Sequence, residues 1–204
     1  MRNYFIGIAG NIGVGKTTFT RKISNHFGWE EIYESVLDNP YLDDFYKDMS
    51  RWSFNLQVYF LQHRISAHIE LMKNNKNVVQ DRTIYEDLEI FAKNLYKMNY
   101  MTKKDWMTFN SLFVQIEKFL RKPDLIIYLR GSTDTLLSRI KKRNRDFEKD
   151  INPEYLYSLN TLYEKWIKNN KFKTLTIETD RFNIFKDHNK LKNIFNEIEK
   201  KLSI

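Results

Sequence analysis

One segment of this chain, Gly10-Asn11-Ile12-Gly13-Val14-Gly15-Lys16-Thr17, constrains its fold more than any other. It matches the pattern G-x-x-x-x-G-K-[ST] at every fixed position. The short apolar run at residues 4–9 predicts a buried strand before it. Residues 17–27 predict a helix after it, since Phe19 and Ile23 recur along one stripe. A strand, a glycine-rich turn and a helix in this order predict a phosphate-binding loop in an α/β protein.

The chemistry of this loop points to a nucleotide. The glycines let successive backbone N–H groups turn inward around an anion, and the helix adds the positive end of its dipole. Lys16 would reach the β and γ phosphates, and the Thr17 hydroxyl would coordinate Mg²⁺. The residues expected to contact the nucleotide are Gly10, Asn11, Ile12, Gly13, Val14, Gly15, Lys16, Thr17 and Thr18.

The nucleotide could be ATP or GTP, but the rest of the sequence favours a kinase. GTPases need an Asn-Lys-x-Asp motif, and none occurs here. The chain has 204 residues, which is short for a helicase or a large ATPase. We therefore expect a small-molecule kinase whose second substrate occupies a helical pocket beside the loop.

The remaining pattern alternates short apolar runs with long helical stretches. Strands are expected at residues 31–33, 77–80, 124–129 and 172–177, and helices at 51–74, 85–97, 102–120, 133–142, 153–170 and 187–202. Only 3 Pro and 6 Gly are available to interrupt them. The pattern predicts an α/β fold, a P-loop kinase with a central parallel sheet of about five strands flanked by helices. We expect a single domain over residues 1–204.

Composition excludes several other classes. Without cysteine the chain can have no disulfide framework, no thiol nucleophile and no cysteine-based zinc site. No apolar run reaches the roughly eighteen residues of a membrane span, and the first residues do not resemble a signal peptide. We expect a soluble cytoplasmic protein. The net charge of +8 suits phosphate ligands, but Lys and Asn are abundant throughout, so the charge alone is weak evidence.

Charged residues follow two of the expected strands and one of the helices. Glu34 ends the second strand, and Asp81-Arg82 follows the third, so both should emerge at the sheet edge where ligands of α/β proteins bind. Arg139 and Arg143 lie i, i+4 on one helix face, and Arg145 follows. These arginines could simply be a solvated helix end. The alternative that we favour is an Arg-rich lid, at about residues 139–152, over the transferring phosphate.

Taken in order, these residues resemble the deoxynucleoside kinase family. The shared features are the P-loop, Glu34 in Glu-Ser-Val, Arg51-Trp52-Ser53-Phe54 leading to Gln57, Arg64, Asp81-Arg82-Thr83, Asp87, the Arg139–Arg145 lid and Pro153-Glu154-Tyr155-Leu156. They cover nearly the whole chain. The stretch from Glu34 to Leu42 is similar to the bacterial branch, which acts on deoxyadenosine or deoxyguanosine.

The resemblance implies roles for the residues around the transferred phosphate. Glu34 matches the carboxylate that accepts the proton of the substrate 5′-hydroxyl, and Arg82 matches the arginine that holds that carboxylate and the reacting oxygen. Asp81 matches the acidic residue near Mg²⁺, beside Thr17. Lys16, Glu34 and Arg82 are therefore the expected catalytic residues.

It also implies how the two substrates are held. Gln57, Arg64 and Asp87 match base-reading side chains, Phe91 matches a ring stacked on the base, and Tyr46 and Glu148 match the pair that binds the sugar 3′-hydroxyl. Arg139, Arg143 and Arg145 match the lid, and the Asp180-Arg181-Phe182 turn matches the loop against the adenine of the donor. The sequence departs from the family pattern at Ser35, Asn39, Phe60 and Asp81.

The side chains expected around the base favour one with an amino group. Gln57 offers a donor and an acceptor, Arg64 only donors, and Asp87 only acceptors. We expect transfer of phosphate from ATP to the 5′-hydroxyl of deoxyadenosine, with deoxyguanosine and deoxycytidine as weaker substrates and thymidine very poor. A deoxyguanosine or deoxycytidine kinase is the main alternative, and a nucleoside monophosphate kinase or a nucleic-acid-binding P-loop protein is a less favoured one.

The expected partners follow from this assignment. They are a small-molecule deoxynucleoside and ATP with Mg²⁺, with no nucleic acid and no membrane, and the chain is expected to form a homodimer.

Overall fold

Five short strands form the centre of the computed structural model, which describes residues 3–33, 39–74, 76–149 and 151–204. The strands are β1 (Phe5–Gly10), β2 (Glu30–Ile32), β3 (Val78–Asp81), β4 (Leu125–Arg130) and β5 (Thr174–Glu178). They run parallel in the order β2-β3-β1-β4-β5. The three central strands, β3, β1 and β4, are buried along almost their whole length because helices cover both of their faces.

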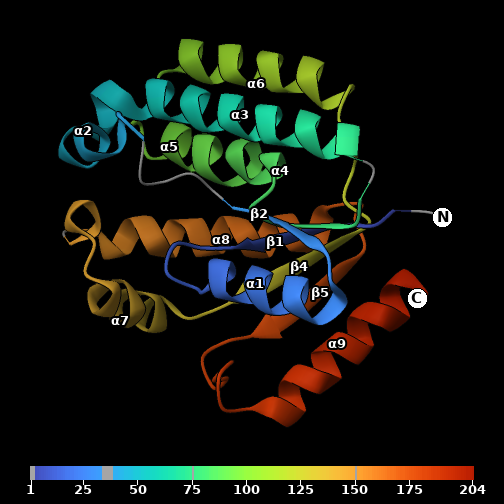
Figure 1. The fold of residues 1–204 in the computed structure, drawn as a ribbon. Helices are drawn as coiled ribbons and strands as arrows, with labels where there is room; N and C mark the ends of the chain where they lie inside the picture. The colour runs from blue at the N-terminus through green and yellow to red at the C-terminus, as the bar shows by residue number, and fades with distance from the viewer. Residues whose placement is uncertain (1–2, 34–38, 75, 150) are drawn as a thin grey trace.

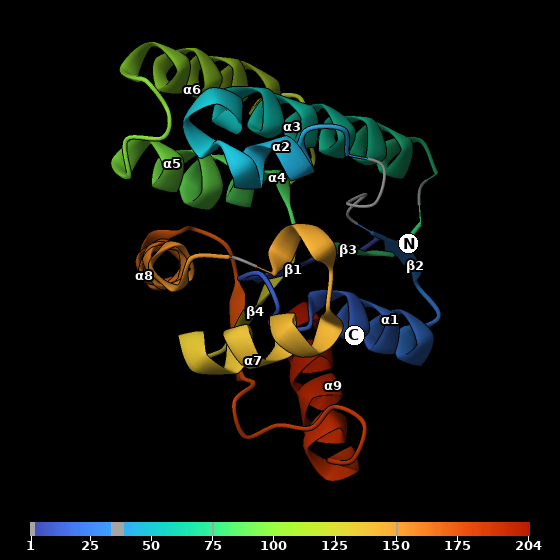
Figure 2. The same ribbon diagram turned by 90° about the vertical axis from the view of Figure 1, so that its left-hand side faces the viewer.

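Helices fill the connections between the strands. They are α1 (Lys16–Phe27), α2 (Leu42–Lys47), α3 (Met49–Asn74), α4 (Ile84–Glu86), the π-helix η1 (Asp87–Ala92), α5 (Lys93–Lys97), α6 (Lys103–Glu117), α7 (Thr133–Arg143), the 3₁₀-helix η2 (Asp146–Glu148), α8 (Pro153–Asn169) and α9 (His188–Leu202). Helices α1 and α9 lie together on one face of the sheet, whereas α3, α5 and α6 form the layer on the other side (Figures 1 and 2). None of the described helices combines the length and apolar character of a membrane span.

The expected fold class is confirmed: the sheet is parallel, five-stranded and flanked by helices. The expected strands and most helices agree with the structure to within a few residues. Two features were not anticipated. Helix α2 follows directly after the Asn39-Pro40 turn, and the expected helix at residues 85–97 contains the π-helical segment Asp87–Ala92. A π-helix is rare and often marks a functional site.

The parallel arrangement brings several chain segments to one edge of the sheet. In the register of β1 and β3, Ile8 pairs with Asp81, so Asp81 lies beside the start of the P-loop. Strand β4 ends next to β1, with Leu129 opposite Gly10. The ends of three neighbouring strands thus meet at a single place, which is where an open α/β sheet binds its ligands.

Candidate active site

The P-loop adopts a conformation that glycine alone accommodates easily. Gly13 has φ of +81°, in the left-handed region. A Cβ atom at Gly13 would lie 2.7 Å from Ile140 Cγ1 and 3.0 Å from the Leu136 carbonyl oxygen, so α7 packs directly against the loop. Any side chain here would push α7 and the loop apart.

A main-chain carbonyl and a side chain of α8 hold the loop in place. Asn11 is buried, and its Nδ2 donates to the Leu156 carbonyl at 2.9 Å and to Asn160 Oδ1 at 2.8 Å. Asn11 Oδ1 accepts from the Ile12 N–H at 2.7 Å. Lys16 Nζ donates to the Asn11 carbonyl at 3.1 Å. The cradle for an anion is therefore organised by the protein itself, which lowers the cost of ordering it when phosphate binds.

Two oxygen-bearing side chains meet where a metal ion would be needed. The Thr17 hydroxyl donates to Asp81 Oδ2 at 2.6 Å. The other carboxylate oxygen, Asp81 Oδ1, is buried and has no hydrogen-bond partner among the residues that the structure describes. A hydroxyl and a carboxylate are hard oxygen ligands, and Mg²⁺ in phosphate sites takes one or two carboxylates with the phosphates themselves. The residues present fit Mg²⁺.

Arg82 is held in an unusual conformation. Its φ is +67°, although it is not glycine. The left-handed region costs such a residue about 1–2 kcal/mol, which other contacts must offset. The backbone N–H donates to the Ile8 carbonyl at 3.0 Å, and Nη1 donates to the Tyr163 hydroxyl at 2.8 Å. The guanidinium lies 4.3 Å from the ring centroid of Phe91.

A buried ion pair marks the opposite end of the site. Arg64 Nε donates to both oxygens of Asp87, at 2.9 and 2.7 Å, and the two side chains are 6% and 1% exposed. Asp87 begins the π-helix, and Phe91, four residues on, also faces the site. Gln57 on α3 is buried, and within the described part of the chain its Oε1 has no hydrogen-bond partner. A buried acceptor without a partner is costly unless a ligand supplies a donor.

The arginines of the expected lid fall into two groups. Arg143 and Arg145 both pair with the buried carboxylate of Glu148, and the Arg145–Glu148 distance is 3.7 Å. Arg139 instead donates to the Val14 carbonyl at 2.9 Å and to the Thr179 carbonyl at 2.6 Å. Burial lowers the pKa of Arg139 from its ordinary value. Arg139 thus braces the P-loop, while the other two lie over the cavity.

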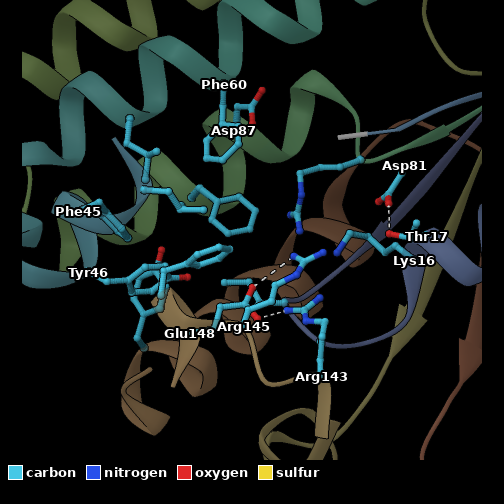
Figure 3. A pocket seen from close by; sticks show the side chains of 18 of the residues that line it. Lys16, Thr17, Phe45, Tyr46, Phe60, Asp81, Asp87, Arg143, Arg145 and Glu148 are labelled. Atoms are coloured by element: carbon cyan, nitrogen blue, oxygen red, sulfur yellow. Dashed lines mark hydrogen bonds and ion pairs between the residues drawn. The ribbon is translucent and has the colours of Figure 1, made fainter. Parts of the chain in front are cut away.

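A cavity of about 450 Å³ joins these groups. Figure 3 shows Lys16, Thr17 and Asp81 at one end, aromatic rings such as Phe45, Tyr46 and Phe60 at the other, and Arg143, Arg145 and Glu148 between them. Of the residues expected from the sequence, those lining it are Ile12, Gly13, Gly15, Lys16, Thr17, Thr18, Tyr46, Gln57, Arg64, Asp81, Arg82, Asp87, Phe91, Arg139, Arg143, Arg145 and Glu148.

Several expected residues lie elsewhere. The described lining does not include Gly10, Asn11, Val14, Asp180, Arg181 or Phe182. The Asp180 carboxylate accepts from the Ser132 N–H at 2.9 Å, and the Phe182 ring packs against Phe19 with its centroid 6.3 Å away. Glu34 falls outside the described residues.

Sequence reasoning missed three aromatic walls of the cavity: Phe45, Phe147 and Tyr155. The Tyr46 and Phe147 rings stack with centroids 6.2 Å apart, and Phe45 packs edge-on against Tyr46 at 5.2 Å. For Phe45 the available signal was the aromatic-rich stretch from Tyr41 to Phe60, but we interpret such rings as core by default, because aromatic residues are more often core than site.

Comparison with known proteins agrees with this geometry. The family model "Deoxynucleoside kinase" matches residues 6–203. A deoxyadenosine/deoxycytidine kinase of Bacillus subtilis is 37% identical, covering 97% of this chain and 92% of its own length. A deoxyguanosine kinase of the same organism is 40% identical over 80% of this chain and 78% of its own.

Solved structures of the deoxyadenosine kinase from M. mycoides are similar throughout. One, with the products dCMP and dCDP bound, has a TM-score of 0.85, 35% identity, and coverage of 95% of this chain and 99% of that one. Another, with dATP bound, has a TM-score of 0.83, 35% identity, and coverage of 94% and 99%. With a family model that spans almost its full length and a cavity that unites a P-loop with a buried polar pocket, this chain belongs to the deoxynucleoside kinase family.

Proposed function

We propose that this protein transfers the γ-phosphate of ATP to the 5′-hydroxyl of a deoxynucleoside, and that deoxyadenosine is the preferred acceptor. One observation carries the proposal: a single cavity contains both Lys16 and Thr17 of the P-loop and the buried Arg64–Asp87 pair. A donor phosphate and an acceptor base can therefore be held together in one space. Relatives named for deoxyadenosine and deoxyguanosine support this assignment.

At the phosphate end, catalysis rests on positioning and on charge. Phosphoryl transfer passes through a loose transition state, so the protein stabilises charge on the transferring group rather than forming covalent bonds. Lys16 and the loop N–H groups would hold the β and γ phosphates. Thr17 and Asp81 would hold Mg²⁺, which neutralises phosphate charge when bound. Glu34 would orient the 5′-hydroxyl and accept its proton, and Arg82 would hold the reacting oxygen.

At the base end, the preference rests on hydrogen-bonding type. Asp87 only accepts, and the buried Oε1 of Gln57 also needs a donor. An exocyclic amino group supplies two N–H donors, and adenine, cytosine and guanine carry one. Thymine has a carbonyl oxygen and a methyl group instead. A site built for a polar partner rejects an analogue that leaves its groups unpaired, so thymidine should be a very poor substrate.

The sugar contacts rest on Tyr46 and Glu148, which both line the cavity. We propose that they bind the 3′-hydroxyl. Glu148 is 5% exposed at its side chain and pairs with Arg143 and Arg145. Binding of the sugar would therefore act on the same carboxylate that holds the two lid arginines.

The decisive experiment is a phosphorylation panel with ATP and Mg²⁺ and with each of the four deoxynucleosides and four ribonucleosides. The expected order is deoxyadenosine first, deoxyguanosine and deoxycytidine weaker, and thymidine last. A deoxynucleoside monophosphate panel, run in parallel, tests the monophosphate kinase alternative. Phosphorylation of monophosphates without phosphorylation of nucleosides would overturn the assignment.

We also propose that residues 1–204 act as one kinase domain, that the protein is cytoplasmic, and that it forms a homodimer. The exposed apolar side chains Met107 and Val114, seven residues apart on the outer helix α6, support the dimer. Sedimentation analysis of wild type and of Met107→Lys would test it. We expect a dimer that the substitution weakens, and a monomeric wild type would contradict it.

A further inference from the structure

Beneath the P-loop, a buried carboxylate and a buried tyrosine join the loop to Arg82. Glu86 is 0% exposed. Its Oε1 accepts from the Gly10 N–H at 3.2 Å, from the Tyr163 hydroxyl at 2.7 Å and from Arg82 Nη1 at 3.3 Å. The Tyr163 oxygen also lies 2.9 Å from the Gly10 carbonyl and accepts from Arg82 Nη1 at 2.8 Å. These four residues are called the Gly10–Arg82–Glu86–Tyr163 cluster below.

A simpler role for Glu86 is that of a helix cap. The Thr83 N–H donates to Glu86 Oε2 at 2.9 Å, and Thr-x-x-Glu is the sequence signature of a capping box. That role uses only Oε2 and needs no burial. The other oxygen, Oε1, meets the first residue of the P-loop and Arg82 at once. The helix cap therefore accounts for the contact of Oε2 but not for the contacts of Oε1.

The Tyr163 hydroxyl connects Arg82 with Glu86, and packing of the Tyr163 ring in the core does not require this contact. Burial raises its pKa well above the usual range, so it stays a neutral hydroxyl with one proton. That hydroxyl lies between Arg82, Glu86 and the Gly10 carbonyl, while its ring stacks on Tyr128 with centroids 5.5 Å apart. The ring belongs to the core, and the hydroxyl belongs to the cluster.

The cluster also accounts for the conformation of Arg82. This residue has a positive φ and lies directly after Asp81. Tyr163 and Glu86 fix Nη1 from one side, and the Phe91 ring lies against the guanidinium. Glu86 also accepts from the Gly10 N–H, and the Tyr163 oxygen lies 2.9 Å from the Gly10 carbonyl. Arg82, which is expected to contact the phosphate acceptor, and the P-loop, which is expected to bind the phosphate donor, are thereby fixed relative to each other.

We propose that Glu86 and Tyr163 are positioning residues for phosphoryl transfer, which act through Arg82 and set its guanidinium relative to the P-loop. The inference rests on the proposed function, because it takes Arg82 to hold the reacting oxygen. Neither residue lines the cavity among the described residues, so neither needs to touch a substrate.

The first test compares Tyr163→Phe with a matched variant, Tyr128→Phe. Each removes one hydroxyl from a buried, mutually stacked ring, and Tyr128 donates instead to Glu164 Oε1 at 3.0 Å. We expect Tyr163→Phe to lower kcat roughly 10-fold, less than the 10² that about 1 Å of misplacement can cost, with KM values for ATP and deoxyadenosine within about twofold. Tyr128→Phe should keep kcat, with a similar loss in Tm.

The second test asks whether the effect passes through Arg82. Tyr163→Phe is repeated in an Arg82→Lys background, where the bond from Nη1 no longer exists. The expected result is strong non-additivity, with less than about a twofold further loss of kcat. Glu86→Gln, which keeps the shape of the side chain, should lower kcat in wild type and do little in the Arg82→Lys background. Tm of every variant identifies loss of folding.

The outcomes separate this inference from the proposed function. A wild type that phosphorylates no deoxynucleoside overturns both. If the wild type is active, three results overturn this inference alone. In the first two, Tyr163→Phe leaves kcat unchanged, or it changes only KM for ATP. In the third case, the fold losses of kcat from Tyr163→Phe and Arg82→Lys multiply in the double variant. A fall in kcat that disappears in the Arg82→Lys background supports it.

Discussion

The two ends of the cavity are built in different ways. The phosphate end consists mainly of main chain from one continuous segment, Gly10 to Thr18, held by Asn11 and by the close approach of α7. The base end consists of side chains from separate elements, with Gln57 and Arg64 on α3 and Asp87 on the π-helix. A main-chain site tolerates little change and leaves a fixed motif in the sequence. A side-chain site can change its ligand through single substitutions.

This difference assigns separate tasks to the two ends. Under the proposed function, the phosphate end would bind a group that all nucleoside triphosphates share, so it would govern whether the reaction proceeds. Under the same proposal, the base end would bind the part in which nucleosides differ, so it would govern which acceptor is used. Arg143, Arg145 and Glu148 lie between them (Figure 3), and the two arginines would bring positive charge to the transferring group. Substitutions at the two ends should therefore affect different kinetic quantities.

The largest effect is expected for Lys16→Ala, which removes the charge on the β and γ phosphates. Turnover should fall by roughly 10³-fold or more, at the upper end of the cost of removing one preorganised group from a charged transition state. Lys22→Ala, on the same helix but outside the described cavity lining, is the matched control. Steady-state rates and Tm would be measured for both. If a folded Lys16→Ala protein keeps a tenth of wild-type turnover, the assignment of this loop as the phosphate-binding P-loop is wrong.

Glu34→Gln should bind deoxynucleoside almost normally and lose at least about 10²-fold in kcat, as expected for a positioned general base. Glu31→Gln, an exposed carboxylate three residues earlier, is the control and should leave kcat unchanged. Nucleoside affinity is measured by calorimetry and kcat by product formation. An unchanged kcat in Glu34→Gln would assign Glu34 a structural role and leave the proton acceptor unidentified.

The same difference explains what the sequence could predict. The P-loop is contiguous and its strand and helix follow from local periodicity, so the fold class and the phosphate end were accessible. Helix α2 was missed because it is short and follows Asn39-Pro40, and the π-helix was missed because one wide turn leaves helical periodicity almost unchanged. Tyr163 was missed because a tyrosine on the apolar face of a helix is usually core.

Arg139 shows a further limit. From its spacing it belongs with Arg143 on one face of α7, but its guanidinium bonds to the carbonyls of Val14 and Thr179. Main-chain acceptors carry no sequence signal, because every residue has one. Which arginine of a basic segment faces a ligand and which binds the backbone is therefore decided by tertiary structure alone.

The lid should give the next largest effect. Replacing Arg143 and Arg145 together by Gln should lower kcat by roughly 10- to 100-fold, since charge on the transferring group develops in the transition state, and should lower nucleoside affinity by less than it lowers kcat. Gln can still hydrogen-bond the buried Glu148. Lys141→Gln with Lys142→Gln removes the same charge from exposed positions of the same helix. If the arginine variant lost only nucleoside affinity, the segment would be an acceptor-binding loop.

The smallest change is expected in selectivity rather than in rate. Arg64→Met and Asp87→Ala are made together, because removing one partner would leave the other as an unpaired buried charge, which is far more destabilising than replacing both. The ratio of kcat/KM for deoxyadenosine over thymidine should fall by on the order of 10-fold, since the site no longer demands an amino group. Lys93→Met with Glu89→Ala makes the same changes in a half-exposed pair at 2.8 Å on the adjoining turns and should leave the ratio unchanged. Competition between the two nucleosides in one reaction measures the ratio directly. If wild type already phosphorylates thymidine as readily as deoxyadenosine, Arg64 and Asp87 do not read the base, and the difference between the two ends of the cavity does not lie in selectivity.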